Sequence, residues 1–269
     1  LKDGNHTVKV YDKAGNAASI TFIVDKVAPI FTVNKFYRAA ETISLRIEET
    51  NLDYVTFDGL LTDLTSWLCA GLAEGEHVIA VYDKAGNMAE RTFVVDKTAP
   101  IITLIKEEKP VDTQYFSVGN DFVINIEEIN LDYVTLNGII ITDFIITIAD
   151  LEDGRYVILA IDKAGNAVSL EFIVDKTDPS VTLRRNMNDI ANEGVYISSF
   201  DTVSIVVDDI NLDRILFDGV VVIVYSWTAS SLSDGIHTII VYDKAGNFTS
   251  VSFIVHKGAP EFTLKEYYV

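Results

Sequence analysis

The sequence predicts an all-β chain made of tandem β-sandwiches with about seven short strands each. Three observations predict this fold class. A pentapeptide recurs at a regular spacing, two-residue turn signals recur between its copies, and the intervening stretches alternate apolar and polar residues with the period of a strand. No stretch keeps the period of an amphipathic helix.

The pentapeptide Asp-Lys-Ala-Gly-Asn sets the register of the repeats. It stands at 12–16, 83–87, 162–166 and 243–247, so that neighbouring copies are 71, 79 and 81 residues apart. The strand after each copy ends in Val-Asp-Lys and then a proline, except that His256 replaces the aspartate after the last copy. One structural unit per copy is therefore expected.

Each unit is predicted to consist of short strands joined by tight turns. Residues 43–47 alternate apolar and polar side chains, as a half-buried strand does. Residues 78–82 and 90–95 predict a hairpin, with Gly86 at the position that needs a positive φ. Further hairpin turns are predicted at Asp58-Gly59, Asn137-Gly138 and Asp218-Gly219. About seven strands in roughly 70–80 residues is the strand density of an immunoglobulin-like β-sandwich.

The recurring proline before each unit predicts the domain limits. A partial repeat with the last two strands is expected at 1–28, whole immunoglobulin-like repeats at 29–99, 100–178 and 179–259, and the first strand of a following repeat at 260–269. The chain is therefore expected to be a segment of a longer array. Its short linkers contain proline and leave neighbouring units little freedom, so the units are expected to form an extended rod.

The charge and composition of the chain argue against several classes of protein. The chain has 40 Asp and Glu against 21 Lys and Arg, a net charge of −19, whereas nucleic-acid binding and polybasic membrane binding need a basic face. A hydrophobic content of 49% and a mean hydropathy of +0.24 rule out a disordered acidic tail. No apolar stretch is long enough for membrane insertion. Cys69 is the single cysteine, so no intrachain disulfide is expected.

Two motifs of the chain resemble a known family. Tyr-Asp-Lys-Ala-Gly-Asn at 82–87, with Phe-x-Val-Asp-Lys-Thr-Ala-Pro at 93–100, resembles the tandem bacterial Ig-like repeats of large cell-surface proteins and adhesins. The resemblance covers essentially the whole chain. It implies secretion, display on the bacterial cell surface, and a structural or adhesive stalk. In some arrays of this kind, calcium ions stiffen the domain junctions.

The acidic residues predict candidate calcium sites between neighbouring domains. A second motif, Glu-Glu-x-Asn-Leu-Asp or Asp-Asp-x-Asn-Leu-Asp, recurs in each whole repeat. In a seven-strand sandwich, the loop with this motif and the pentapeptide loop lie together at the end of the domain that receives the preceding linker. The linker aspartate arrives there too, and oxygen ligands from three segments are what Ca²⁺ requires. The candidate ligands are Asp25, Glu48, Glu49, Asn51, Asp53, Asp83 and Asn87 at the first junction; Asp96, Glu127, Glu128, Asn130, Asp132, Asp162 and Asn166 at the second; and Asp175, Asp208, Asp209, Asn211, Asp213, Asp243 and Asn247 at the third.

The same residues allow a second interpretation that needs no ion. The acids would form a solvated pole in which Asn51 and Asp53 make Asx turns. Adjacent glutamates also point to opposite sides of a strand, so that both cannot readily bind one ion without a bend. His256 makes the fourth linker the one least suited to an ion. Counter-charge would come instead from the pentapeptide lysines Lys13, Lys84, Lys163 and Lys244.

The remaining candidates are interpreted as structural. Trp67 and Trp227 predict core anchors, and Cys69 predicts a buried thiol. The repetition of an acidic pair on successive units argues against a glycosidase, and no G-x-S-x-G, P-loop or H-E-x-x-H motif is present, so no enzyme activity is expected. One histidine in each of three units predicts packing on a strand face rather than a metal cluster; these are His6, His77 and His237.

The function expected from these observations is that of a structural and adhesive stalk segment, outside the cell, which projects a binding region. Its expected partners are the neighbouring Ig-like domains of the same chain. Three alternatives are an Ig-like adhesin module that contacts host or matrix glycan or protein, a non-catalytic spacer of a secreted polysaccharide- or protein-degrading enzyme, and a filament subunit joined by strand complementation.

Overall fold

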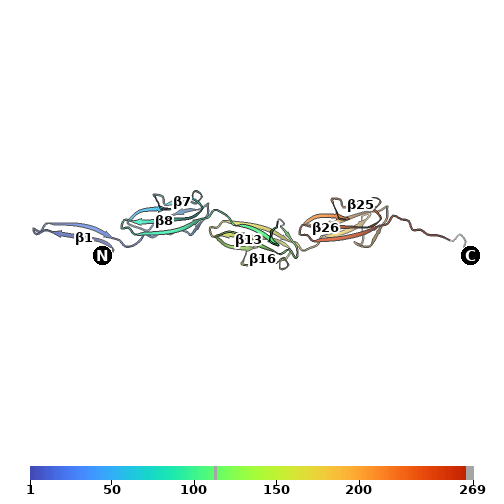
Figure 1. Ribbon diagram of the computed structural model, residues 1–269, viewed down its shortest axis with the longest axis horizontal. Helices are drawn as coiled ribbons and strands as arrows, with labels where there is room; N and C mark the ends of the chain where they lie inside the picture. Colours follow the sequence, from blue (N-terminus) through green and yellow to red (C-terminus); the bar gives the residue numbers. More distant parts are fainter. Residues whose placement is uncertain (112–113, 265–269) are drawn as a thin grey trace. The chain divides into compact units, whose positions relative to one another are not determined.

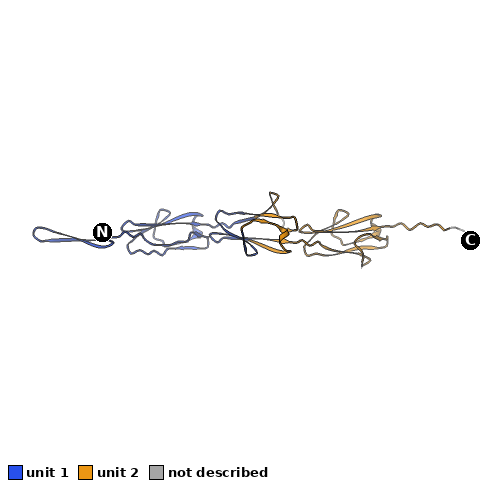
Figure 2. Ribbon diagram, turned by 90° about the horizontal axis from the view of Figure 1, so that it is seen from below, with its two compact units in different colours: residues 1–102, 126–141, 159–169 blue, residues 103–125, 142–158, 170–269 orange. Residues whose placement is uncertain are grey.

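The computed structural model describes residues 1–111 and 114–264. This part of the chain folds into β-strands, and its helical elements are three single-turn 3-10 helices (Figure 1). The chain divides into two compact units, residues 1–102, 126–141 and 159–169, and residues 103–125, 142–158 and 170–269 (Figure 2). The boundary between the two units passes through the middle repeat and does not coincide with the predicted domain limits. Those limits, and the predicted arrangement of the repeats as an extended rod, therefore remain predictions.

Residues 1–28 contain an antiparallel hairpin. Strand β1 (Gly4–Tyr11) pairs with β2 (Ala17–Val24) in an unbroken register from Gly4↔Val24 to Tyr11↔Ala17. The pentapeptide forms the loop between them, as the pattern of alternation predicts.

The repeat at 29–99 has seven strands in two sheets. The larger sheet has the order β3-β9-β8-β5-β6, with β3 parallel to β9 and the other pairs antiparallel, and the smaller sheet pairs β4 with β7. The elements are β3 (Phe36–Tyr37), β4 (Thr42–Ser44), β5 (Leu52–Phe57), β6 (Leu60–Thr62), β7 (Ser66–Leu68), η1 (Cys69–Gly71), β8 (Gly75–Asp83) and β9 (Met88–Val95).

The repeats at 100–178 and 179–259 have their elements in the same order, with a first strand and a short second strand added. The larger sheets are ordered β12-β18-β17-β14-β15 and β21-β27-β26-β23-β24, and the smaller ones β11-β10-β13-β16 and β20-β19-β22-β25. The elements of the former are β10 (Ile101–Lys106), β11 (Lys109–Pro110), β12 (Tyr115–Phe116), β13 (Phe122–Glu127), β14 (Leu131–Leu136), β15 (Ile139–Ile141), β16 (Ile145–Ile146), η2 (Ile148–Asp150), β17 (Gly154–Asp162) and β18 (Ala167–Val174). Those of the latter are β19 (Ser180–Arg185), β20 (Asn188–Asp189), β21 (Val195–Ile197), β22 (Thr202–Asp208), β23 (Leu212–Phe217), β24 (Val220–Val222), β25 (Ser226–Thr228), η3 (Ala229–Ser231), β26 (Gly235–Asp243) and β27 (Phe248–Val255).

This architecture confirms the predicted all-β, Ig-like sandwich class. The predicted first strand at 260–269 is not tested in full, because 265–269 lie outside the described residues and 260–264 are described without a strand.

The tight turns have the backbone that their residues predict. Asp58 and Gly59 have φ values of 48° and 77°, so both central residues of the β5–β6 turn are left-handed, as a type I′ hairpin requires. Asn137 and Asp218 occupy the same position with φ values of 48°. Gly86 has a φ of 91°, which confirms that it supplies the positive φ of the pentapeptide loop.

The core of the first whole repeat lies between its two sheets. Ile79, Val81 and Phe93 alternate inward on β8 and β9 and are fully buried. Trp67 is buried and stacks on Phe57 with ring centroids 5.0 Å apart, which confirms it as a core anchor. The corresponding Trp227 packs, partly buried, against the core of the third whole repeat. Cys69 is a buried free thiol whose pKa is raised by burial, as predicted.

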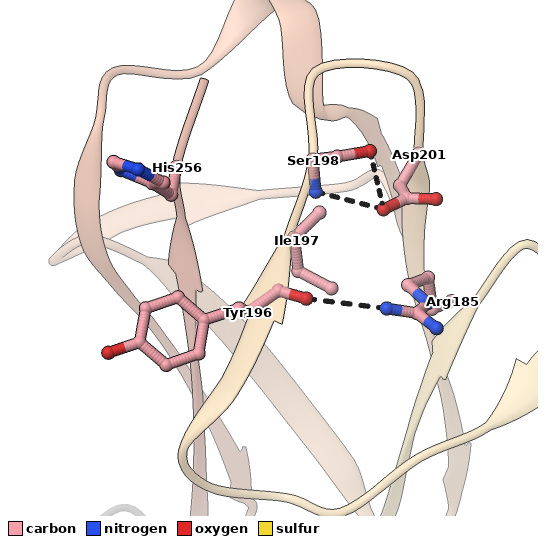
Figure 3. A pocket seen from close by; sticks show the side chains of 6 residues that line it. All are labelled: Arg185, Tyr196, Ile197, Ser198, Asp201 and His256. Atoms are coloured by element: carbon pink, nitrogen blue, oxygen red, sulfur yellow. Dashed lines mark hydrogen bonds between the residues drawn. The ribbon is translucent and has the colours of Figure 1, made fainter. Parts of the chain in front are cut away.

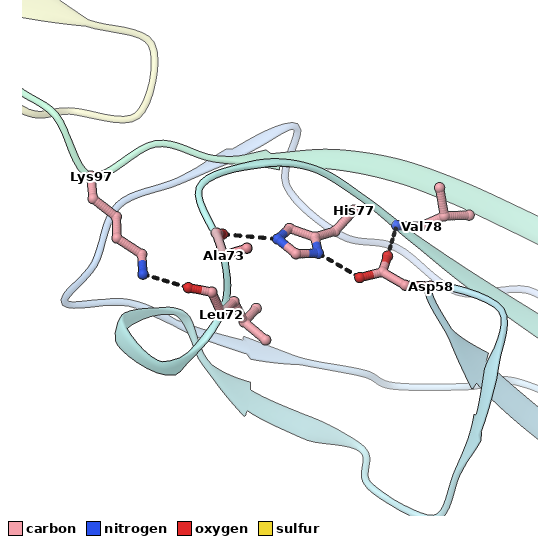
Figure 4. A network of polar contacts seen from close by, with 6 residues as sticks. All are labelled: Asp58, Leu72, Ala73, His77, Val78 and Lys97. Atoms are coloured by element: carbon pink, nitrogen blue, oxygen red, sulfur yellow. Dashed lines mark hydrogen bonds and ion pairs between the residues drawn. The ribbon is translucent and has the colours of Figure 1, made fainter.

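A buried histidine in the first and third whole repeats is held by the preceding turn (Figure 4). His77 Nδ1 lies 2.7 Å from Asp58 Oδ2, and Nε2 lies 3.0 Å from the carbonyl oxygen of Ala73. Asp58 Oδ1 also accepts the backbone N–H of Val78 at 2.9 Å. The ring is thus held between a side-chain oxygen and a backbone oxygen. His237 has the same contacts with Asp218 and Ser233.

The middle repeat changes both members of this pair at once. Tyr156 stands where the histidine stands elsewhere, and Asn137 stands where the aspartate does. The Tyr156 hydroxyl donates to the carbonyl oxygen of Glu152 at 3.0 Å, so it bonds the backbone four residues back, as the His77 ring does. The ring packs on Phe172 with centroids 5.2 Å apart. Sequence reasoning found the packing role but missed the aspartate partner.

We predict that Asp58 and His77 are energetically coupled. Asp58→Asn leaves a ring nitrogen of His77 without its carboxylate, and His77→Tyr leaves the carboxylate without the ring. Each single change should destabilise the first repeat by about 1–3 kcal/mol. The double variant reproduces the pairing of the middle repeat and should be more stable than the sum of the single effects. Urea unfolding followed by Trp67 fluorescence in a Trp227→Phe background measures this cycle, and strictly additive effects would contradict it.

Candidate functional site

The pentapeptide loop is held by its own first and last residues. The Asp83 carboxylate accepts hydrogen bonds from the backbone N–H groups of Ala85 at 2.9 Å and Asn87 at 2.8 Å. It also accepts one from the Asn87 side-chain amide at 2.7 Å. Burial acts to raise the pKa of Asp83, but these hydrogen bonds outweigh it and hold the pKa below its ordinary value. The loop therefore enters the junction with a fixed shape.

The linker aspartate of the preceding segment lies against this loop. Asn87 Nδ2 donates to the backbone carbonyl oxygen of Asp25 at 3.2 Å, and Asn51 Nδ2 donates to Asp25 Oδ2 at 3.1 Å. The other carboxylate oxygen of Asp25 accepts the backbone N–H of Val27 at 3.0 Å. Two asparagines from two loops thus hold one linker residue, by its backbone and by its side chain.

The same arrangement recurs at the next two linkers, and we call it the asparagine clasp. At each linker, one asparagine donates to the aspartate side chain and the other to its backbone carbonyl, at distances between 2.8 and 3.1 Å. The three clasps are Asp25 with Asn51 and Asn87, Asp96 with Asn130 and Asn166, and Asp175 with Asn211 and Asn247.

The second acid of each acidic block orients the first asparagine of the clasp. Glu49 Oε1 accepts the backbone N–H of Asn51 at 2.7 Å, and Glu128 and Asp209 do the same for their asparagines. The first acid and the last aspartate of each block are exposed instead. The predicted ligands therefore separate into two groups, one that takes part in the clasps and their loops and one that is exposed to solvent. The exposed group consists of Glu48, Asp53, Glu127, Asp132, Asp208 and Asp213.

The linker lysine ties the linker to its own repeat. Lys97 Nζ donates to the carbonyl oxygens of Leu72 at 2.5 Å and Ala70 at 3.1 Å, which belong to η1 and its end. Lys176 and Lys257 make the corresponding contacts with η2 and η3. Each Asp-Lys pair thus bonds forward to the next loops and backward to the repeat that it leaves.

Two of the pentapeptide lysines lie over aromatic rings. Lys163 Nζ is 5.9 Å from the centroid of the Phe36 ring, and Lys244 Nζ is 5.2 Å from that of Tyr115. These distances are within the range of cation–π attraction. The lysines therefore contact the preceding repeat, which sequence reasoning did not foresee.

One group of carboxylates has the spacing of a cation site. Among the described residues, oxygens of Asp25, Glu49 and Asp83 lie within 4.8 Å of one another. At the third junction, burial and the nearby charges of Asp243, Asp175 and Asp208 raise the pKa of Asp209. Carboxylates therefore repel one another at the third junction, and the calcium sites remain a prediction.

We predict that Asn87 restrains the linker as well as its own loop. Asn87→Ala removes both bonds of the amide and should cost about 1–2 kcal/mol. Hydrogen exchange should increase in residues 25–29 as well as in 83–87. Asn16→Ala is the matched control, because Asn16 makes the same bonds to Asp12 inside its loop. An unchanged exchange rate in 25–29 would contradict the linker role.

We predict that Asp209→Asn stabilises the third whole repeat at neutral pH. The raised pKa means that the ionised carboxylate is disfavoured in the fold, whereas Asn keeps an acceptor for the N–H of Asn211. The gain should be about 0.5–1 kcal/mol and should vanish as the pH falls below the ordinary aspartate value. Unfolding followed by Trp227 fluorescence in a Trp67→Phe background measures it. Asp208→Asn, an exposed neighbour, should have a smaller effect, and an equal effect would reject the prediction.

Comparisons with known proteins find similarity in fold alone. No protein-family model matches the sequence, and no curated protein matches it. A glucan utilization locus protein of Bacteroides ovatus, SGBP-B, solved with a mixed-linkage heptasaccharide, aligns at 15% identity and a TM-score of 0.24 over 86% of this chain and 71% of that one. The first eight Ig domains of Down Syndrome Cell Adhesion Molecule align at 12% and 0.34, over 96% of this chain and 40% of that one.

A surface layer protein is also among the similar structures. Domains 1–6 of surface layer protein SbsC align at 11% identity and a TM-score of 0.26, over 97% of this chain and 45% of that one. This chain therefore spans less than half of the length of two of the three. Identities this low assign no ligand to the chain. None of the described helices is long and apolar enough to cross a membrane.

Proposed function

We propose that the chain is a structural segment of a bacterial surface protein, in which Ig-like repeats are joined by asparagine clasps and hold a binding region away from the cell. The observation that carries this proposal is the recurrence of one clasp at three successive linkers with the same atoms paired. An arrangement repeated at three successive linkers serves the linkers rather than a single substrate.

The clasp restrains a linker in a way that suits a stiff spacer. A bond to the Asp25 side chain alone would leave the backbone free to turn, and a bond to its carbonyl alone would leave a hinge. Because both are bonded, bending the linker requires both to break. The lysine at the next position adds bonds to the repeat behind it. Each neutral hydrogen bond contributes about 1 kcal/mol, so the restraint depends on their number.

We predict that removing the side-chain half of the clasps widens the distribution of end-to-end distances. The triple variant Asn51→Ala, Asn130→Ala and Asn211→Ala spares the pentapeptide loops. Single-molecule energy transfer between dyes near residues 5 and 250 should show a broader distribution than in the unmodified chain. Alanine in place of the exposed Asp53, Asp132 and Asp213 is the control. If the two variants match each other, the clasp does not set stiffness.

A divalent cation at the first junction is the second part of the proposal. Asp25, Glu49 and Asp83 offer oxygen ligands, the type that Ca²⁺ prefers. The clasp asparagines donate N–H groups to two of these carboxylates, which leaves fewer oxygens than the six to eight that Ca²⁺ takes. The donor set therefore fits a weak site completed by water, with affinity in the range of about 0.1–1 mM found in extracellular modules.

We predict that CaCl₂ raises the melting temperature of the first whole repeat and that Glu49→Gln abolishes this response. Glutamine keeps the acceptor for the Asn51 N–H but removes the charge. Glu48→Gln is the control, because Glu48 is adjacent and exposed. Calorimetric titration with CaCl₂ measures binding directly. A melting temperature that does not respond, or an equal effect of both variants, would reject the ion and leave the clasp intact.

A further inference from the structure

Each five-stranded sheet ends in a short strand of exposed aliphatic residues. The strands β6, β15 and β24 stand last in the three sheet orders, so each of them pairs on one side only among the described residues. Their first two side chains are exposed, and these are Leu60, Leu61, Ile139, Ile140, Val220 and Val221. A strand at the edge of a sheet presents unpaired backbone groups, which can pair with a further strand.

The backbone of the edge strand is free at a defined residue. In the third whole repeat, Phe217 pairs with Val220 across the Asp218-Gly219 turn. The pair that closes a two-residue hairpin exchanges hydrogen bonds, so the next residue, Val221, turns its N–H and C=O to the side away from β23. A second extended backbone satisfies both groups at once. The chemistry of this edge therefore fits a strand.

The third edge lacks the acid that guards the other two. Asp63 is the first residue after β6, and Asp143 is the second residue after β15. The third whole repeat has Ile223 and Val224 at these two places. Charged side chains beside an edge strand hinder its pairing with other chains. We call residues 220–225 the open edge, because no such charge protects them.

The open edge is apolar and uncharged along its whole length. Its sequence is Val-Val-Val-Ile-Val-Tyr, and Ile223 is 91% exposed, Val224 48% and Tyr225 45%. The stretch without a charged residue runs from Gly219 to Ser233. Six residues of high β propensity, without charge or proline, are the signature of a segment that pairs with identical copies of itself.

The charge of the chain restricts where a second copy can approach. With a net charge of −19 on each, two copies repel each other wherever their acids meet. A two-fold axis at Val221 aligns two open edges antiparallel and pairs the free backbone groups of the two Val221 residues. The nearest acid, Asp218, then lies beside Val224 of the second copy. Its carboxylate already bonds to His237 and Thr238 within its own repeat, so no acid faces another acid.

The same pairing is unfavourable in the first whole repeat. Leu61 is the residue equivalent to Val221, since it follows the closing pair of the β5–β6 hairpin. A two-fold axis at Leu61 places Asp63 of one copy opposite Gly59 of the other, next to Asp58. Like charges on neighbouring strands destabilise their pairing. The first repeat therefore provides a matched control for the third.

The third whole repeat also has a polar hollow of about 530 Å³, but its charged side chains are bonded within the hollow (Figure 3). Asp201 Oδ2 accepts the backbone N–H of Ser198 at 2.9 Å and the Ser198 hydroxyl at 3.0 Å. Arg185 Nη1 donates to the carbonyl oxygen of Tyr196 at 3.4 Å. The open edge, with free backbone groups and no charge, is the better candidate for a contact with a partner.

We propose that the open edge of the third whole repeat pairs with the open edge of a second copy of this chain, antiparallel and across a two-fold axis at Val221. The contact adds a link between chains to the structural role proposed above, and it does not involve the asparagine clasps. Each copy contributes the six residues of the open edge, against about 20–30 residues a side in an interface of standard size. One contact is therefore weak and reversible.

Disulfide trapping tests the geometry. A hydrogen-bonded antiparallel pair has its Cα atoms about 5.5 Å apart, within the range that a disulfide spans. A full-length Val221→Cys chain should therefore form crosslinked pairs on mild oxidation, with Cys69 silent because it is buried. Leu61→Cys, at the equivalent and similarly exposed position of the first repeat, is the control and should crosslink about threefold more slowly or less. Equal rates of crosslinking overturn the proposal.

Sedimentation over a concentration series up to about 1 mM tests the energetics. Ile223→Asp puts an acid where the first repeat has Asp63, and it should weaken association about threefold or more. Leu64→Asp adds the same charge to the first repeat and should have no effect. Association should strengthen from about 0.15 M to 0.5 M salt, because screening reduces the repulsion between copies. A chain that stays monomeric at about 1 mM, an equal effect of the two variants, or association that weakens with salt overturns the proposal.

Discussion

The arrangement of the junctions depends on one side-chain amide, that of Asn87 and its two counterparts. The amide carries two N–H bonds, and one goes to the aspartate of its own loop while the other goes to the linker carbonyl of the preceding segment. The first bond fixes the loop, and only a loop of fixed shape presents the second bond in the right place. The internal fold of the loop therefore positions the bond to the linker. An aspartate at this position would offer no donor, which explains why an acidic chain uses asparagine here.

The aspartate and the lysine of each Asp-Lys linker bond to different neighbouring repeats. The aspartate bonds forward to the clasp, and the lysine after it bonds backward to the carbonyls at the end of a 3-10 turn. Neither lysine contact depends on the side chain that it meets, because both acceptors are backbone. The sequence of the turn can change, as it does between Cys69–Gly71 and Ala229–Ser231, without losing the lysine contacts. The linker thus tolerates divergence of the repeats that it joins.

Sequence reasoning predicted the strands, the hairpin turns and the meeting of three segments at three linkers, because these follow from period, turn residues and chain order, and it predicted the buried thiol because a free cysteine packs as a small apolar residue. It could not decide between Glu48 and Glu49, since alternation places them on opposite sides without saying which side faces the linker. Nor could it pair Asp58 with His77, because that contact depends on the register of β5 against β8. A signal was present in the paired change to Asn137 and Tyr156. The cation–π role of the pentapeptide lysines required knowledge of which ring lies across the linker.

The acidity of the chain follows from how its turns are built. Besides the pentapeptide and the clasps, carboxylates accept backbone N–H groups within other turns, as Asp143 does for Ile145 and Asp201 for Ser198. A carboxylate is a stronger acceptor than a neutral oxygen, so a turn held by a carboxylate has a shorter and stronger hydrogen bond. These turn carboxylates contribute to the net charge of −19. Their mutual repulsion is seen at Asp209, whose pKa is raised by burial and by the charges of its acidic neighbours. Any cation that binds there would relieve a repulsion that the turns have already created.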